Sequence, residues 1–171
     1  MKLGILSDTH RKFPLAKEAI DLLIEKQAEY LIHAGDICEY DTIEYIKNTN
    51  LPYVAVYGNN DAHMVQYHND FNLHKEPYYF KIEDVKFKLM HLPFYMSPDS
   101  DVVIFGHTHI FQVEQQKQTL FLNPGEVCAR EKPLSECVLL EITESEFVVQ
   151  YFAKDITTNR LSEKIYKFER K

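Results

Sequence analysis

Five short apolar runs recur along the chain, and each is followed within a few positions by a side chain of a type that binds metal ions. The runs occupy residues 3–6, 30–32, 53–56, 87–90 and 102–105. Their aliphatic and aromatic content is typical of buried strands. The polar residues that follow them are Asp8, His10, Asp36, Asn59, His91, His107 and His109. Because ligands of open α/β sheets bind beyond the carboxyl ends of strands, we expect these side chains to converge.

Helical spacing appears between the first three runs. Leu15, Ala19, Leu22 and Leu23 recur at helical intervals and predict a helix over residues 14–26, with an early proline where a helix tolerates it. A second, shorter helix fits residues 42–47. Strands that alternate with helices indicate a parallel core.

The second half of the chain reads mostly as strands joined by tight turns. We predict three hairpins: residues 78–82 with 86–90, residues 111–115 with 119–122, and residues 136–142 with 146–152. Residues 164–169 alternate polar and apolar side chains, which favours a last edge strand. These elements predict two mixed β-sheets packed face to face, with helices outside.

Composition predicts a single domain over residues 1–171, with the last 15–20 residues as an edge strand or appendage. A chain of 171 residues with 45% apolar content buries one core but is short for two. The net charge of −7 provides no basic stripe for non-specific nucleic-acid binding. An anionic substrate would therefore need help from metal ions.

Cysteine usage and the N-terminal residues favour a cytoplasmic protein. Cys38, Cys128 and Cys137 lack metal-binding C-x-x-C spacing and leave one thiol unpaired in any disulfide scheme. The apolar residues before Asp8 are too few for a signal sequence or a membrane span.

The candidate chemistry rests on short motifs. Asp8 and His10 are two residues apart, and in an extended segment such side chains point the same way. They can therefore bind one cation together. The histidines of Gly106-His107-Thr108-His109 are the more specific signal, with surface histidines as the alternative. Taken alone, Gly35-Asp36 and Gly58-Asn59-Asn60-Asp61 also fit ordinary turns. Three of the five glycines directly precede candidate ligands, which favours a metal site over a chance placement of these residues.

In this order the motifs resemble those of the calcineurin-like metallophosphoesterases. That family shows D-x-H, G-D, G-N-x-D/E, a lone histidine and then G-H-x-H. The chain length and the Asn123-Pro124-Gly125 turn are most similar to the small YfcE-like branch. The resemblance covers residues 1 to about 142 and implies a four-layer α/β/β/α sandwich with a dinuclear metal centre at one edge.

The same resemblance implies a ligand set and a mechanism. Asp8, His10 and His109 would bind one metal ion, Asn59, His91 and His107 would bind the other, and Asp36 would bridge both. A hydroxide bridging the metals would then attack a phosphate diester, with Asp36, Asn59 and Asn60 as the catalytic residues. Apart from the resemblance, Arg11 follows His10 and is a candidate substrate contact, with a solvated loop arginine as the alternative. Nitrogen and oxygen donors without thiolate suit Mn²⁺, Fe²⁺, Co²⁺, Ni²⁺ or Zn²⁺, and the resemblance favours Mn²⁺.

Two positions depart from the family pattern. Many relatives have a histidine, thought to protonate the leaving oxygen, where this chain has Asn60, and an asparagine cannot act as a general acid. This departure favours diesters or activated leaving groups. Relatives usually have His-Gly and then a helix where this chain has His91, and Pro93 and Pro98 exclude a regular helix. We therefore expect a more open site beside His91.

Two other functions remain open at this stage. One is a phosphomonoesterase or nucleotide phosphatase, which would require another acid in place of Asn60. The other is a protein-binding scaffold, because the family also contains a retromer coat subunit with an impaired site. The predicted partners are a small phosphodiester or nucleotide-type substrate and, as a possibility, further copies of the chain. Neither a membrane nor a nucleic acid is expected as a partner.

Overall fold

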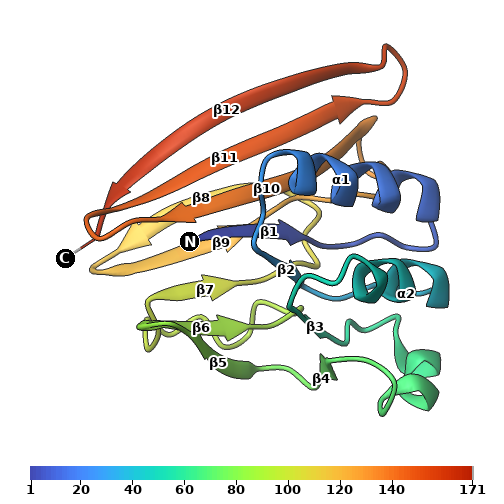
Figure 1. Cartoon of the computed structure of the whole chain (residues 1–171), viewed down its shortest axis with the longest axis horizontal. Coiled ribbons are helices and arrows are strands. Elements are labelled where there is room, and N and C mark those ends of the chain that lie inside the picture. Colours follow the sequence, from blue (N-terminus) through green and yellow to red (C-terminus); the bar gives the residue numbers. More distant parts are fainter. Residues whose placement is uncertain (171) are drawn as a thin grey trace.

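Two β-sheets packed face to face form the body of the protein (Figure 1). The computed structural model describes residues 1–170. The larger sheet has the strand order β12-β11-β10-β1-β2-β3-β4, and the smaller has the order β5-β6-β7-β9-β8. In the larger sheet β1 to β4 pair in parallel out to one edge, and β10 to β12 add antiparallel strands on the other side. In the smaller sheet the parallel pairs lie at the centre, between antiparallel edge strands. The two mixed sheets predicted from the sequence are therefore present.

The strands of the larger sheet are β1 (Lys2–Leu6), β2 (Tyr30–His33), β3 (Tyr53–Val56), β4 (Leu73–His74), β10 (Leu134–Ile142), β11 (Glu146–Asp155) and β12 (Arg160–Glu169). Those of the smaller sheet are β5 (Tyr78–Ile82), β6 (Val85–Leu89), β7 (Val102–Ile104), β8 (Gln112–Gln116) and β9 (Thr119–Asn123). The helices are α1 (Phe13–Glu25), α2 (Tyr40–Asn48) and the 3₁₀-helix η1 (Ala62–Tyr67). The predicted helices and hairpins thus lie within one or two residues of their observed ends, except for β11, which extends three residues further.

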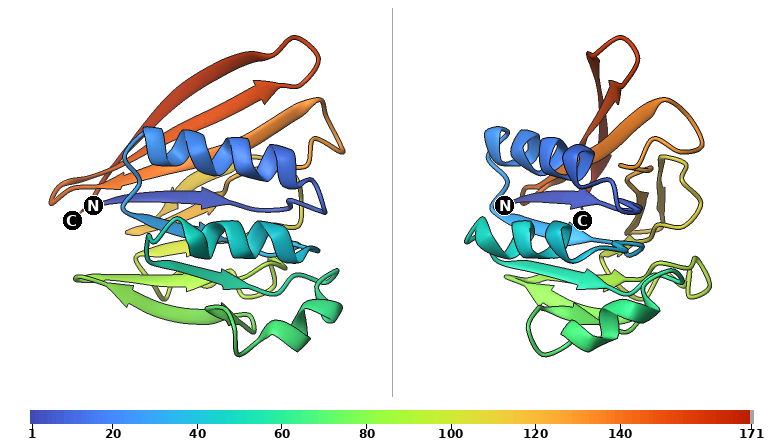
Figure 2. Two further views of the ribbon diagram at one scale, coloured as in Figure 1. Left: turned by 45° about the vertical axis from the view of Figure 1, so that its right-hand side comes forward. Right: turned by 90° about the vertical axis from the view of Figure 1, so that its right-hand side faces the viewer.

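Apolar side chains fill the space between the sheets. Alternate residues of β1 and β3, such as Leu3, Ile5 and Val56, face inward and meet Phe87 and Ile104 from the smaller sheet. The outer face of the larger sheet packs on α1 and α2, which the side view in Figure 2 shows as a separate layer. Burial on both faces explains why the central strands are continuously apolar rather than alternating.

The smaller sheet is covered differently. Within residues 1–170 no α-helix lies on its outer face, and residues 91–101 cover it as an irregular loop, as predicted from the prolines. The loop is tied down by Lys88, whose buried amino group donates to the carbonyl oxygens of Tyr95 and Ser97 at 2.8 and 2.9 Å. That amino group also pairs with Asp99 at 2.5 Å. A buried lysine with several partners therefore holds a segment that has no secondary structure of its own.

The C-terminal strand is longer than the sequence indicates. The alternating pattern predicts a strand over residues 164–169, whereas β12 begins at Arg160 and pairs with β11 along ten residues. The first half of β12 is exposed on both faces, so it shows no apolar alternation that would reveal it. The β11–β12 hairpin projects from the body in Figure 2. In the part of the chain that the structure describes, no helix is both long and apolar enough to cross a membrane.

Candidate metal centre

All seven side chains predicted to bind metal lie together beyond the carboxyl ends of β1, β2, β3, β6 and β7. The arrowheads of β1, β6 and β7 point to the same side of the molecule in Figure 1. Asp36 is central, because its Oδ2 atom lies 3.3 Å from His10 Nε2 and 3.4 Å from His91 Nε2. The other six side chains form two groups of three, one on each side of Asp36.

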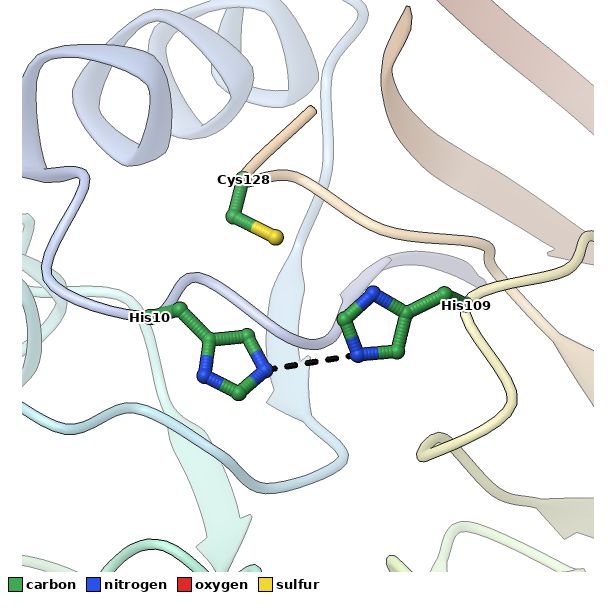
Figure 3. Close-up of side chains that lie close together, drawn as sticks. All are labelled: His10, His109 and Cys128. Carbon is green, nitrogen blue, oxygen red and sulfur yellow. Dashed lines mark hydrogen bonds between the residues drawn. The ribbon is translucent and has the colours of Figure 1, made fainter. Parts of the chain in front are cut away.

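Asp8, His10 and His109 form the first group, which we call the acidic half. His109 Nε2 lies 3.2 Å from Asp8 Oδ1 and 3.3 Å from His10 Nε2. His10 Nε2 lies 3.6 Å from the same carboxylate oxygen. Figure 3 shows the two imidazoles side by side, with nitrogens facing each other. One carboxylate oxygen and two ring nitrogens therefore surround a common point.

Asn59, His91 and His107 form the second group, which we call the amide half. The side-chain oxygen of Asn59 lies 3.0 Å from His91 Nε2 and 3.1 Å from His107 Nδ1. The two rings meet edge to face. This half has an amide oxygen where the acidic half has a carboxylate, so it carries no negative charge of its own.

The backbone at the cluster adopts conformations that non-glycine residues seldom use. Five of the seven candidate ligands have left-handed φ angles: Asp8 (56°), His10 (41°), Asp36 (55°), His107 (68°) and His109 (59°). Such conformations cost roughly 1–3 kcal/mol each and persist where the surroundings fix them, commonly at functional sites. The turns after the strands are therefore shaped to aim these side chains inward.

The donor set fits divalent cations. Asp8 Oδ1 is the one buried side-chain polar atom in residues 1–170 without a hydrogen-bond partner, although two imidazole nitrogens lie close to it. A buried carboxylate oxygen without a hydrogen bond is costly unless a cation neutralises it. Nitrogen and oxygen donors of this kind suit Mn²⁺, Fe²⁺, Co²⁺, Ni²⁺ or Zn²⁺.

The pKa values reflect the same demand for positive charge. Burial alone would raise the pKa of Asp8, but its contacts with His10 and His109 hold it well below the ordinary value. Burial opposes ionisation of His109, yet the Asp8 carboxylate helps to raise its pKa to about 10. Burial would likewise raise the pKa of Asp36, but contact with His91 helps to lower it to about 2. Both carboxylates are therefore ionised at neutral pH and attract protons or metal cations.

Two histidines are oriented by acceptors behind them. His109 Nδ1 donates to Glu126 Oε2 at 2.6 Å, and His91 Nδ1 donates to the carbonyl oxygen of Ala34 at 2.8 Å. Each ring therefore directs its Nε2 atom at the cluster, as is usual for metal-binding histidines, and a bound ion would take the place of the proton that the raised pKa retains there. Glu126 is fully buried and also accepts backbone N–H groups of residues 130–132. The sequence analysis missed Glu126, whose only signal is its place directly after the Asn-Pro-Gly turn.

Two positions beside the cluster, Gly58 and Gly106, have no space for a side chain. A side chain at Gly58 would place its Cβ 2.2 Å from Asp36 Oδ1 and 2.3 Å from the Asp36 nitrogen. At Gly106 a Cβ would lie 2.1 Å from the hydroxyl of Ser7, which donates to Asp8 at 2.7 Å. The φ angle of Gly106 is not left-handed, so the backbone conformation does not itself require glycine there. Its absence of a side chain instead lets the G-H-x-H segment approach Asp8.

Asn60 and Asp61 hold the loops together. The backbone N–H and the side-chain amide of Asn60 donate to the two oxygens of Asp36 at 2.9 and 2.7 Å. The buried carboxylate of Asp61 accepts the N–H groups of Ile37, Cys38 and Gly58. Asp61 therefore joins the Asp36 loop to the Asn59 loop, the structural role that its position in a turn indicates.

Other polar residues lie around the cluster. His33 is buried outside it, between Thr9 and the N–H of Gly35, and burial lowers its pKa to about 3. Arg11 Nε donates to the carbonyl oxygen of Cys38 at 3.1 Å. Figure 3 shows Cys128 beside His10 and His109; its thiol donates to Glu126 at 3.2 Å. Arg130, which the sequence analysis also missed, brings its NH2 group to 3.2 Å from His109 Nε2.

Two cavities open beside the cluster. The larger, of about 570 Å³, is lined by His10 and Cys38. The smaller, of about 300 Å³, is lined by Asn59 and His107. Asn60 and Arg130 line both cavities, so the two spaces meet at the cluster.

The fold and the sequence place the chain in a known class: it belongs to the calcineurin-like phosphoesterase superfamily. The family described as "Calcineurin-like phosphoesterase superfamily domain" matches residues 1–145. Phosphodiesterase MJ0936 of Methanocaldococcus jannaschii is 32% identical over 160 residues, which cover 86% of this chain and 96% of the relative. Phosphodiesterase YfcE of Escherichia coli K12 is 24% identical over 147 residues, or 74% and 79% of the two chains. The predicted resemblance is confirmed.

Solved structures agree with the fold. A single mutant of Vps29 from Entamoeba histolytica gives a TM-score of 0.78 at 21% identity, covering 98% of this chain and 99% of that one. The zinc complex of wild-type Vps29 from the same organism gives 0.71 at 23% identity, covering 99% of both. At these identities the likeness shows the fold alone. The predicted sandwich of two mixed sheets is thereby confirmed.

Proposed function

We propose that the protein is a phosphodiesterase that uses two divalent metal ions, with Mn²⁺ as the first candidate. The acidic half, Asp8, His10 and His109, would bind one ion. The amide half, Asn59, His91 and His107, would bind the other, and Asp36 would contact both. The observation that carries this proposal is the position of Asp36 Oδ2 between two groups of three donors.

The protein's own residues prepare the site. When bound, the ions would supply positive charge for the phosphoryl oxygens and would lower the pKa of a water molecule. Asn60 holds both oxygens of Asp36, and the hydrogen bonds from Nδ1 to Glu126 and Ala34 direct the Nε2 atoms of His109 and His91 toward the cluster. The side chains are thus oriented before a substrate arrives, which lowers the cost of binding it.

Diesters suit this site better than monoesters for two reasons. A diester has two ester groups, and two cavities flank the cluster. Asn60 donates to Asp36 and has no acidic proton for a leaving alkoxide, so poor leaving groups are disfavoured.

A phosphomonoesterase or nucleotide phosphatase is the alternative within the same chemistry. If the missing acid restricts the enzyme to diesters, Asn60→His should raise monoester hydrolysis by roughly 10²-fold while leaving diester turnover within a few fold. Steady-state rates on p-nitrophenyl phosphate and bis-p-nitrophenyl phosphate measure both effects. Unchanged monoester hydrolysis would remove this explanation of the preference.

The scaffold function predicted as a further alternative draws support from the Vps29 likeness, which concerns the fold. The complete donor set favours the enzyme. An exposed binding surface would not require a buried carboxylate oxygen without a hydrogen bond.

The test is hydrolysis of bis-p-nitrophenyl phosphate by metal-stripped protein, with Mn²⁺ added back. Activity should require the metal and disappear in Asp36→Ala. A matched control, Asp41→Ala, removes an exposed carboxylate of α2 and should keep full activity. No hydrolysis by folded protein with Mn²⁺, Co²⁺, Ni²⁺ or Zn²⁺ would contradict the proposed function and favour the scaffold.

A further inference from the structure

The larger of the two cavities has an unusual lining for this acidic chain. Three cationic side chains border it, those of Arg11, Lys12 and Arg130, and no carboxylate does. The chain as a whole has 26 acidic and 19 basic residues. Positive side chains are therefore gathered at the space that opens directly beside His10.

The remaining lining does not cancel this charge. Cys38 and Cys128 also border the cavity, and both are buried free cysteines rather than carboxylates. Arg130 lies 3.5 Å from Glu131, but both side chains are more than half exposed. Exposed pairs of this kind contribute little and are readily exchanged for another anion.

Two of the cationic side chains, Arg11 and Arg130, are tied to the cluster by contacts. His10 and Arg11 both have left-handed backbone angles, which turn the chain sharply before α1. The Nε–H group of Arg11 donates to the Cys38 carbonyl, which leaves the two terminal nitrogens of the guanidinium for a ligand. Arg130 borders both cavities and reaches the acidic half through His109.

Part of the cavity wall is apolar. Leu15, Ala129 and Ile156 line the same cavity, and Ile156 is 45% exposed. A ligand in this cavity would therefore contact an apolar surface beside positively charged groups. This combination suits an organic group that carries a negative charge, because the apolar part gains from burial and the anion gains from the guanidinium groups.

We propose that this cavity binds a negatively charged, largely apolar or aromatic ester group of the substrate. The inference rests on the proposed phosphodiesterase function and makes the preferred substrates diesters that carry a carboxylate or phosphate besides the phosphate that is cleaved. The charged ester group occupies the larger cavity, and the second ester group occupies the smaller one beside His107. A diester without the additional charge uses the same centre with a higher KM.

Two synthetic diesters with the same leaving group test the assignment. p-Nitrophenyl phenyl phosphate has a neutral second group, and p-nitrophenyl 4-carboxyphenyl phosphate has an anionic one. Both release p-nitrophenolate, so the chemical step is closely matched. At low ionic strength we expect a KM roughly 5- to 10-fold lower for the carboxylated ester. Added salt should reduce the difference.

Variants of the three cationic residues then test whether the difference in KM arises in this cavity. The triple variant Arg11→Gln, Lys12→Gln, Arg130→Gln should bring the two KM values to within about twofold of each other. The single variant Lys12→Gln changes one exposed side chain and should lose part of the preference, so it serves if the triple variant does not fold. Circular dichroism and the thermal midpoint check folding.

A control variant separates local contacts from the overall charge. Lys81→Gln, Lys117→Gln, Lys164→Gln removes the same three positive charges at exposed positions outside the cavity lining. It should keep the preference for the carboxylated ester. An equal loss in this variant would show a long-range effect of charge and would overturn the cavity assignment.

The remaining outcomes are also decisive. Equal KM values in the wild-type protein would overturn the inference while leaving the phosphodiesterase proposal intact. If the wild-type protein hydrolyses neither ester, the proposed function fails, and both compounds then serve as ligands for titration calorimetry. Tighter binding of the carboxylated ester that is lost in the cavity variant would still support the anion site, whereas equal dissociation constants would reject it.

Discussion

The two halves of the metal centre differ in charge, burial and backbone conformation. In the acidic half, Asp8 and His109 are buried, and all three members have left-handed backbone angles. In the amide half, Asn59 and His107 are exposed, and His107 alone is left-handed. His109 is oriented by a buried carboxylate, whereas His91 is oriented by a backbone carbonyl.

This difference indicates a division of roles. A half with its own carboxylate and a fixed backbone should bind a cation tightly. A half with neutral donors and two exposed members depends on Asp36 for charge and should exchange its ion more readily. We therefore expect stepwise metal binding, with the acidic half filled first.

The largest effect should come from the residue that the halves share. Asp36→Ala removes negative charge from both sides and should lower diesterase activity on the order of 10³-fold, or about 4 kcal/mol in the barrier. Metal analysis by inductively coupled plasma spectrometry should find both ions reduced. Loss of one ion alone would show that Asp36 belongs to one half.

Removing one histidine from each half compares them directly. His109→Ala should weaken the tighter ion roughly 100-fold, whereas His91→Ala should weaken the looser ion roughly tenfold and leave the tighter one in place. Calorimetric titration of metal-stripped variants measures both steps. The same loss in both variants, at the same step, would contradict the division into halves.

The carboxylate behind His109 gives a more selective change. Glu126→Gln keeps the shape of the side chain but weakens the hydrogen bond that orients the ring. It should weaken metal binding to the acidic half roughly 10-fold, which is at the lower end of the loss in affinity seen when a residue hydrogen-bonded to a metal ligand is replaced. Glu144→Gln, at the exposed turn between β10 and β11, is the matched control. An equal effect of the two substitutions would remove the orienting role of Glu126.

The smallest change makes the halves more alike. Asn59→Asp gives the amide half its own carboxylate and should tighten the looser ion several-fold, up to about tenfold. The two binding steps should then approach each other in the same titration. An unchanged gap between them would show that charge does not set the difference.

The parts of this structure that sequence predicts best are the buried strands and the residues that follow them. Both faces of the central strands are covered, so these strands are apolar throughout and the sequence shows clearly where each one ends. The candidate ligands follow a short distance after β1, β2, β3, β6 and β7. The loop after His91 is also predictable, because Pro93 and Pro98 exclude a helix there.

Long-range contacts were less predictable. Glu126 is a charged residue that ordinarily would be exposed, and its burial depends on hydrogen bonds that form only in the folded chain. Arg130 reaches the centre because residues 123–132 pass beside His109, which no local pattern reveals. The two-residue strand β4 and the helix η1 are too short to give a periodic signal.

The stoichiometry of Mn²⁺ binding to the metal-stripped wild-type protein tests the central claim most directly. Titration calorimetry, with the metal content of the dialysed complex as a check, should show two ions per chain that bind in two steps of different affinity. Binding of no ion, or of one ion alone, would contradict the two-metal centre. Two steps of equal affinity would leave the centre standing but contradict the difference between its halves.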